Sequence, residues 1–250
     1  GIPVELNEAH HWGMRDASDV TFVVSAYLAA YNARSYGVHD HIVQMMFNSP
    51  PGTSDSMDLA KMLALLEMIA GLENEDFRVW RQTRTGLLSY PLQEDAARAH
   101  LAASIYVQLA LKPHIVHIVG HTEAHHAATA EDIIAACHMA RRVIDNAGKG
   151  QPDLTADPEV QARKEHLISE AQHTLQAIQQ LAPSNTADPL ADAAVLAQAV
   201  SSGILDAPQL KNNFYARGTI RTAIIDGACE AVDESGTLLS ETERMTDLIH

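Results

Sequence analysis

Histidines and one acidic residue gather in a short stretch near the middle of the chain. Residues 114–126 contain five histidines and Glu123, and an apolar run precedes the polar cluster. A helix is expected to begin after Thr129, because a hydroxyl there and a carboxylate at Asp132 can satisfy free N–H groups of its first turn. His121 and Glu123 then lie at the carboxyl end of a strand, where parallel α/β folds bind ligands.

The residue types allow more than one kind of chemistry at this strand end. His121 and Glu123 could bind a ligand or transfer protons, or the histidines could simply bond to the backbone of the loop. Histidines with carboxylates also bind zinc or iron, but the H-x-x-x-H-H spacing lacks the helical H-E-x-x-H geometry, so we assign no metal site. His117 lies deeper in the strand, as a ligand contact or as a core histidine.

Two arginines lie in another predicted strand, residues 77–85. Arg81 and Arg84 have opposite parity in that strand, so only one is expected to point inward. A buried guanidinium is costly unless it meets an anion, and a carboxylate can be clamped by two parallel hydrogen bonds. An inward arginine therefore suggests a substrate carboxylate, with a salt bridge to Glu5 or Asp16 as the alternative.

Strands and helices alternate through the first 150 residues. The expected strands are residues 2–7, 41–48, 77–85 and 115–119, each followed by a helix. A loop is expected at residues 10–13. Beyond residue 150, helices are expected to begin at Asp157 and Asp188, each followed by proline, and residues 219–240 alternate like a small antiparallel hairpin. Repeated strand–helix units predict a parallel sheet.

Each predicted strand has one apolar face and one polar face. The polar side chains assigned to this face are Glu5, Asn7, Gln44, Asn48, Arg81 or Arg84, His117 and His121. A doubly wound sheet is apolar on both faces, whereas a barrel wall has helices outside and a ligand cavity inside. Because a full barrel needs about 250 residues for eight strands, we predict that residues 1–150 form an α/β half-barrel of four βα units, and residues 151–250 a helical extension with a terminal hairpin.

Composition excludes several classes of function. The chain has 250 residues, is 46% hydrophobic and carries a net charge of −15. This acidity argues against nucleic-acid and anionic-membrane partners, and no apolar run is long enough to cross a bilayer. The first residues do not read as a signal peptide, so we expect a cytoplasmic protein. Two cysteines without C-x-x-C spacing exclude a disulfide framework or a zinc ribbon.

Residues 119–129, V-G-H-T-E-A-H-H-A-A-T, are similar to a strand-end pattern of one enzyme family. They resemble the K-T-x-x-E-A-x-x-I-P-T pattern in the catalytic barrel of adenosylcobalamin-dependent glutamate (methylaspartate) mutase and of related cobalamin mutases and aminomutases. The match is at the Glu123-Ala124 pair and at Thr129. Val119 stands where the family has lysine and Ala128 where it has proline, and His121 could supply a replacement donor.

Other stretches follow the same family in the same order. Residues 19–38 resemble a helix of the family's barrel, residues 86–95 its Gly-Gly-Phe-Pro loop, and residues 203–208 its G-v-m-D-i-P phrase. Together these matches cover most of the chain and correspond to the C-terminal half of the family's subunit. The resemblance implies that the missing N-terminal half-barrel comes from another chain or segment.

The resemblance also implies a reaction, namely a radical 1,2-rearrangement of a small amino or carboxylic acid. Glu123 would hold the ribose of the adenosyl group, with His121 and Glu123 as the catalytic pair and Thr122 and His125 beside the cofactor. The cobalamin-ligating D-x-H-x-x-G motif is absent, so the corrinoid would lie on a partner subunit. The substrate would contact residues of the polar face: Arg81, Arg84, Asn7, Gln44, Asn48 and His117.

Three other functions stay open at this stage. An aminomutase would also hold pyridoxal phosphate, although no Schiff-base lysine is evident on a strand. A non-catalytic half-barrel for assembly or cobalamin handling is favoured by the valine at position 119. A metal-dependent hydrolase or lyase would use the histidine cluster instead.

Overall fold

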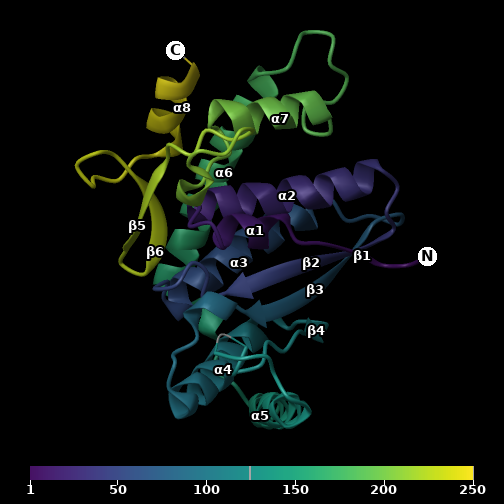
Figure 1. The fold of residues 1–250 in the computed structure, drawn as a ribbon. Coiled ribbons are helices and arrows are strands. Elements are labelled where there is room, and N and C mark those ends of the chain that lie inside the picture. The colour runs from purple at the N-terminus through teal and green to yellow at the C-terminus, as the bar shows by residue number, and fades with distance from the viewer. Residues whose placement is uncertain (124, 250) are drawn as a thin grey trace.

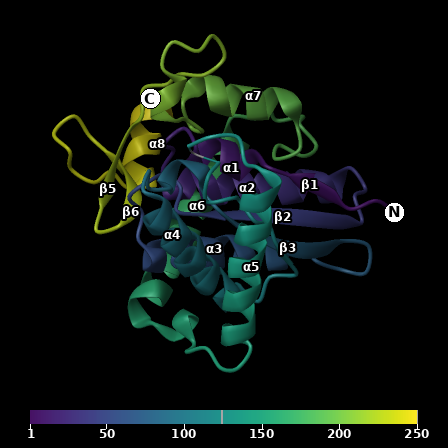
Figure 2. The same cartoon turned by 60° about the horizontal axis from the view of Figure 1, so that its bottom comes forward.

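Four parallel strands form the sheet that carries the candidate site (Figures 1 and 2). The computed structural model describes residues 1–123 and 125–249. The strands are β1 (Val4–Leu6), β2 (Asp40–Phe47), β3 (Arg78–Thr85) and β4 (Ile115–Val116), in the order β1-β2-β3-β4. All neighbouring pairs are parallel. The predicted α/β class with a parallel sheet is therefore confirmed.

The helices that connect the strands pack on one face of the sheet. They are α1 (Glu8–Gly13), α2 (Asp19–Ser35), α3 (Asp55–Ala70) and α4 (Glu94–Gln108), and α5 (Ala130–Ala147) follows β4. Val43 and Phe47 of β2 belong to one buried core with residues of α2 and α3. Thr85 pairs in register with Phe47, and its hydroxyl bonds to Ser104 of α4 at 2.9 Å. The strand order never reverses, so the chain is wound in one direction only.

The second half of the chain packs against the same helices. It contains α6 (Pro158–Gln180), α7 (Ala193–Ser202), β5 (Arg221–Ile225), β6 (Ala228–Val232) and α8 (Glu241–Ile249). Val160, Leu167 and Ile178 of α6 share the core of α2 and α3. The predicted hairpin is present as antiparallel β5 and β6, and it lies on the side where β2 and β3 end (Figure 1). The boundary at residue 150 stays a prediction.

Buried charges join this second half to the sheet. Lys61 of α3 bonds to Asp19 of α2 at 3.0 Å, to Asp58 at 2.7 Å and to the Ser49 carbonyl at 2.9 Å. Burial alone would lower the pKa of Lys61, but the carboxylates of Asp19 and Asp58 outweigh burial and raise it. Arg163 of α6 bonds to Asp19 at 3.1 Å, so a single carboxylate connects α2, α3 and α6.

Three sequence predictions were wrong in detail. The strand predicted over residues 115–119 has only two paired residues, because the Val119 carbonyl accepts the Tyr90 hydroxyl at 2.9 Å instead of a strand partner. The loop expected at residues 10–13 is part of α1. The helix expected from Asp188 begins at Ala193, because Asp192 caps it. The cap at Thr129 is confirmed, with both bonds of the capping box.

Candidate functional site

Polar side chains from the strands and from the residues that follow them gather on the face of the sheet opposite α2 and α3. The register pairs Glu5 with Ile42, Gln44 with Gln82, and Met46 with Arg84, which places these residues on that face. His117 extends it at β4, where its N–H donates to the Thr83 carbonyl at 2.8 Å. We call the following set the polar-face cluster: Glu5, His10, Gln44, Gln82, Arg84, His117 and Glu123.

Much of this face remains in contact with solvent. Glu5 and His117 are exposed, and Ile42 and Trp80 are half-buried. Ile115 is 37% exposed. The centre of the face, at Gln44, Met46 and Gln82, is buried. A parallel sheet is normally covered on both faces. The polar face of this sheet is partly exposed, so it could be covered by a further layer of protein.

Hydrogen bonds fix one side of the cluster. The Gln44 side-chain amide donates to the Glu5 carboxylate at 2.8 Å, and the Gln44 carbonyl oxygen meets Nδ1 of His10. His10 lies on α1, immediately after β1. Burial lowers the pKa of His10 most, the bond to Gln44 opposes this, and the charges of Arg84, His11 and His117 lower it further. His10 is therefore a neutral ring beside a cation at neutral pH.

Arg84 is the cation at the centre of the cluster. Its Nε is buried and has no hydrogen-bond partner among the described residues, and the same holds for Nε2 of Gln82 two positions earlier. Burial lowers the pKa of Arg84, while the carboxylates of Glu123 and Glu5 oppose that shift. The guanidinium still stays charged. Two unpaired donors on one strand face, one of them charged, are suited to an anionic ligand.

His117 and Tyr90 border Arg84. Partial burial lowers the pKa of His117, with the charge of Arg84 adding to the effect and Glu5 and Glu123 opposing it. Burial raises the pKa of Tyr90, and its hydroxyl holds the Val119 carbonyl. Tyr90 thereby fixes the start of the loop that carries Glu123.

Glu123 turns back toward the strand end. Its Oε1 accepts the Gly120 N–H at 2.6 Å, and the side chain is exposed. A Cβ added at Gly120 would lie 3.1 Å from that oxygen, so glycine permits the close approach. The second carboxylate oxygen stays available to a ligand. Ala124, the other half of the matched pair, lies outside the described residues.

The loop residues next to Glu123 lie in two environments, either packed against α4 or exposed to solvent. His121 is buried, and its Nε2 accepts from Arg98 of α4 at 3.3 Å. Within the described ranges, Nδ1 of His121 and the hydroxyl of Thr122 are buried without a partner. His125 is exposed beside His126. His121 and Thr122 thus have buried donors that bind nothing among the described residues, whereas His125 faces solvent.

The remaining predicted site residues lie away from the cluster. Arg81 is on the opposite face, where its guanidinium bonds to the Lys112 carbonyl at 3.1 and 3.0 Å. Asn48 is buried against α4, and its Oδ1 accepts from Ser104 at 2.7 Å. Asn7 is exposed at the end of β1. Gln44, Arg84, His117 and Glu123 are therefore brought together, and Asn48 and Arg81 are not.

Sequence reasoning missed His10 as a site residue. The expected loop at residues 10–13 left no reason to direct this ring toward β2. One signal was present, because His10 follows the end of a strand by only a few residues, as Glu123 does. Helix α1 turns it back over Gln44, where it meets the cluster.

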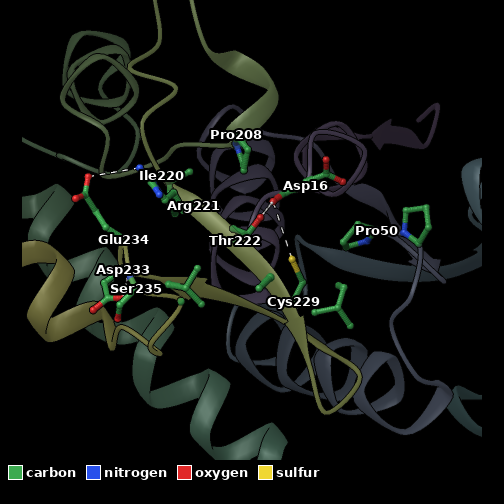
Figure 3. A pocket seen from close by; sticks show the side chains of 15 residues that line it. Asp16, Pro50, Pro208, Ile220, Arg221, Thr222, Cys229, Asp233, Glu234 and Ser235 are labelled. Atoms are coloured by element: carbon green, nitrogen blue, oxygen red, sulfur yellow. Dashed lines mark hydrogen bonds and ion pairs between the residues drawn. The ribbon is translucent and has the colours of Figure 1, made fainter.

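A separate cavity lies between the hairpin and the loop after β2 (Figure 3). It has a volume of about 660 Å³. Its polar side chains are paired within the protein: Thr222 donates to the Asp16 carbonyl at 2.7 Å, and Arg221 meets Glu234 at 3.4 Å (Figure 3). The polar-face cluster, which has unpaired donors, is the stronger candidate site.

A scan against models of protein families finds no match, and a search of curated proteins finds none either. Within residues 1–123 and 125–249, no three His, Cys, Asp or Glu side chains group closely enough to hold a metal ion. Over the same part of the chain, the helices are all too short or too polar to cross a membrane.

Proposed function

We propose that the chain is one half of a (β/α)8 barrel and contributes to an adenosylcobalamin-dependent radical rearrangement of a small amino or carboxylic acid. The observation that carries the proposal is the partly buried guanidinium of Arg84, whose Nε has no hydrogen-bond partner among the described residues, on the polar face of a sheet wound in one direction. An N-terminal half-barrel and a cobalamin-binding subunit would be its partners, in the cytoplasm.

The winding of the sheet supports a barrel. In a doubly wound sheet the strand order reverses at a switch point, and helices cover both faces. Here the order is β1-β2-β3-β4, and the connecting helices pack on the face of Val43 and Phe47. A barrel of eight strands keeps the order constant and encloses its second face. Four more strands would enclose the polar face of this chain.

The polar-face cluster supplies a binding site for an acid. Arg84 and Gln82 present donors to a carboxylate, and the two hydrogen bonds of a guanidinium fork fix its orientation. Glu5 and Glu123 already offset the charge of Arg84, so a bound carboxylate would be held by direct hydrogen bonds of the guanidinium and not by an excess of positive charge. Closure of the barrel would exclude water and strengthen these interactions.

The strand end has groups that fit the nucleoside part of the cofactor. Glu123 offers an exposed carboxylate to ribose hydroxyls, and the two residues before it, His121 and Thr122, have buried donors without a partner among the described residues. The cofactor supplies the radical chemistry when bound. The chain holds Glu123 in place through Gly120 and fixes the loop through Tyr90. The cobalamin subunit would face the carboxyl-end rim, on the side of the hairpin.

The structure gives less support to the aminomutase alternative. Lys61 is the fully buried lysine, and its ammonium is neutralised by Asp19 and Asp58 on the opposite side of β2 from the cluster. A protonated, paired lysine is a poor Schiff-base nucleophile. Val119 is buried and holds Tyr90 through its carbonyl, so the family's lysine is replaced by a packing residue.

Binding of acids tests the site. We expect short-chain carboxylates, with propionate as the probe, to shift the NMR signal of the Arg84 guanidinium and to bind with saturable affinity. Arg84→Gln should abolish binding, whereas Arg81→Gln on the opposite face serves as the matched control and should not change it. Equal loss in both variants, or no saturable binding, would count against the site.

Activity tests the reaction. The chain, purified with the proteins that associate with it, is loaded with adenosylcobalamin and frozen with each member of a panel of amino and carboxylic acids. We expect an EPR signal from cobalt(II) coupled to an organic radical with at least one acid. Glu123→Gln should weaken that signal strongly, and Glu131→Gln, an exposed change in the first turn of α5, should not. A signal that never depends on the acid would refute the reaction.

A further inference from the structure

The bond between Gln44 and Glu5 determines which nitrogen of His10 carries the proton. An ionised carboxylate only accepts hydrogen bonds, so the atom of Gln44 that meets Glu5 must be its NH2 group. That bond is 2.8 Å long. The Gln44 oxygen must then face His10, and Nδ1 of His10 must be the donor. A charged residue on β1 thereby fixes the tautomer of a ring on α1 through the side chain between them.

This tautomer leaves Nε2 of His10 as a hydrogen-bond acceptor. Nε2 has no hydrogen-bond partner among the described residues, and the buried atoms without a partner do not include it. The charges that act on the ring come from Arg84, His11 and His117, and all of them favour its neutral form. His10 is held by Gln44, which pairs in register with Gln82, and Arg84 lies two residues further on the same face, so this acceptor belongs to the same face as the donors of Arg84 and Gln82. The two kinds of group recognise different parts of one small molecule.

The geometry points to His10 as the residue that selects acids carrying a hydrogen-bond donor, an amine or a hydroxyl, next to the carboxylate bound by Arg84. This inference rests on the proposed acid site and adds a second recognition group to it. A donor on the ligand would bond to Nε2 of His10. A ligand with only a carbonyl at that position would place two acceptors against each other and would be disfavoured.

Three-carbon acids give a matched test. Propionate has no second polar group, lactate adds a hydroxyl and pyruvate adds a carbonyl, all at the same charge; alanine adds an ammonium group. We expect the wild-type chain to bind lactate and alanine about tenfold more tightly than propionate and pyruvate, a ratio that corresponds to ~1.4 kcal/mol. NMR titration of the Arg84 guanidinium and the His10 ring measures the four affinities.

Variants separate His10 from the rest of the site. His10→Leu should reduce the ratio of the affinity for lactate to the affinity for propionate to about one. Propionate should still bind, because Arg84 is unchanged. His11→Leu, at an exposed neighbouring ring, is the control and should keep the ratio. Lowering the pH until His10 is protonated should remove the preference for lactate over propionate in the wild type, because Nε2 of His10 then donates a hydrogen bond. The charged or titratable groups around His10 are Glu5, Arg84, His11 and His117.

The tautomer can be measured without any ligand. We expect 15N shifts that place the proton of His10 on Nδ1, and Glu5→Gln, a change at an exposed residue, should mix the two tautomers. A proton on Nε2 in the wild type, or equal affinity for lactate and propionate, overturns the role of His10 and leaves the acid site intact. Binding of none of the four acids overturns the acid site and this inference together.

Discussion

Removal of the buried ammonium at Lys61 is expected to destabilise the protein strongly. The side chains of Lys61 and Asp58 are 0% exposed and that of Asp19 is 1% exposed. Lys61→Met has a similar length and would leave Asp58 buried without a cation, while Asp19 keeps its bond to Arg163. Breaking a buried pair in this way costs ~3–5 kcal/mol, because the remaining charge is not compensated.

An exposed ion pair gives the matched control. Lys164 meets Glu67 at 2.8 Å, but Glu67 is 59% exposed, so Lys164→Met should cost less than ~1 kcal/mol. Urea denaturation followed by circular dichroism measures both. We expect Lys61→Met to lower the midpoint by at least ~1 M, if the slope is ~3 kcal/mol per molar urea. Equal midpoints for the two variants would refute the structural role of the buried network.

Three further predictions concern other parts of the fold. Burial lowers the pKa of His41 to about 4. Because its pKa in the unfolded chain is higher, the protein should lose at most ~3 kcal/mol of stability as the pH falls from 6.5 toward 4. His41→Gln should remove this pH dependence in urea titrations. Gly86→Ala would place a Cβ 2.8 Å from the Asn48 carbonyl oxygen and should cost ~1–3 kcal/mol in the same assay. Thr129→Ala removes the cap of α5 and should cost ~1 kcal/mol, with faster amide hydrogen exchange in its first turn.

Periodicity was sufficient to predict the sheet and its two faces. Gln44 stands between the apolar Val43 and Met45, and Arg84 stands between two threonines. Because side chains alternate between faces with a period of two, Gln44 and Arg84 are each assigned to the face opposite their neighbours. The opposite parity of Arg81 and Arg84 follows from the same rule, and the structure places them on opposite faces. Helix starts with a local signal were also predictable, as the capping box at Thr129 shows.

Long-range contacts decided what the sequence did not predict. Asn48 has the parity of the polar face, but it follows the last residue of β2 with a positive φ of 57°, which turns it toward Ser104 of α4. His121 continues the alternation of the preceding strand, yet that strand ends early and the ring packs against Arg98. His10 joins the cluster through a bond to a residue 34 positions away. The contacts of Asn48 and His121 have no local sequence signal, and that of His10 has only its position shortly after a strand.

The unpaired sheet edges and the exposed polar face favour the same kind of partner. β1 and β4 are the edge strands, with three and two residues, and edge strands with unpaired backbone groups favour association. Beyond β4, Ile133 and Ile134 of α5 are 51% and 55% exposed. A layer of helices could cover the exposed isoleucines, but it would bury the charge of Arg84 against apolar side chains at high cost. A second sheet whose strands pair with β1 and β4 would satisfy both edges and enclose the guanidinium in a polar cavity, which is why we favour a partner of four strands.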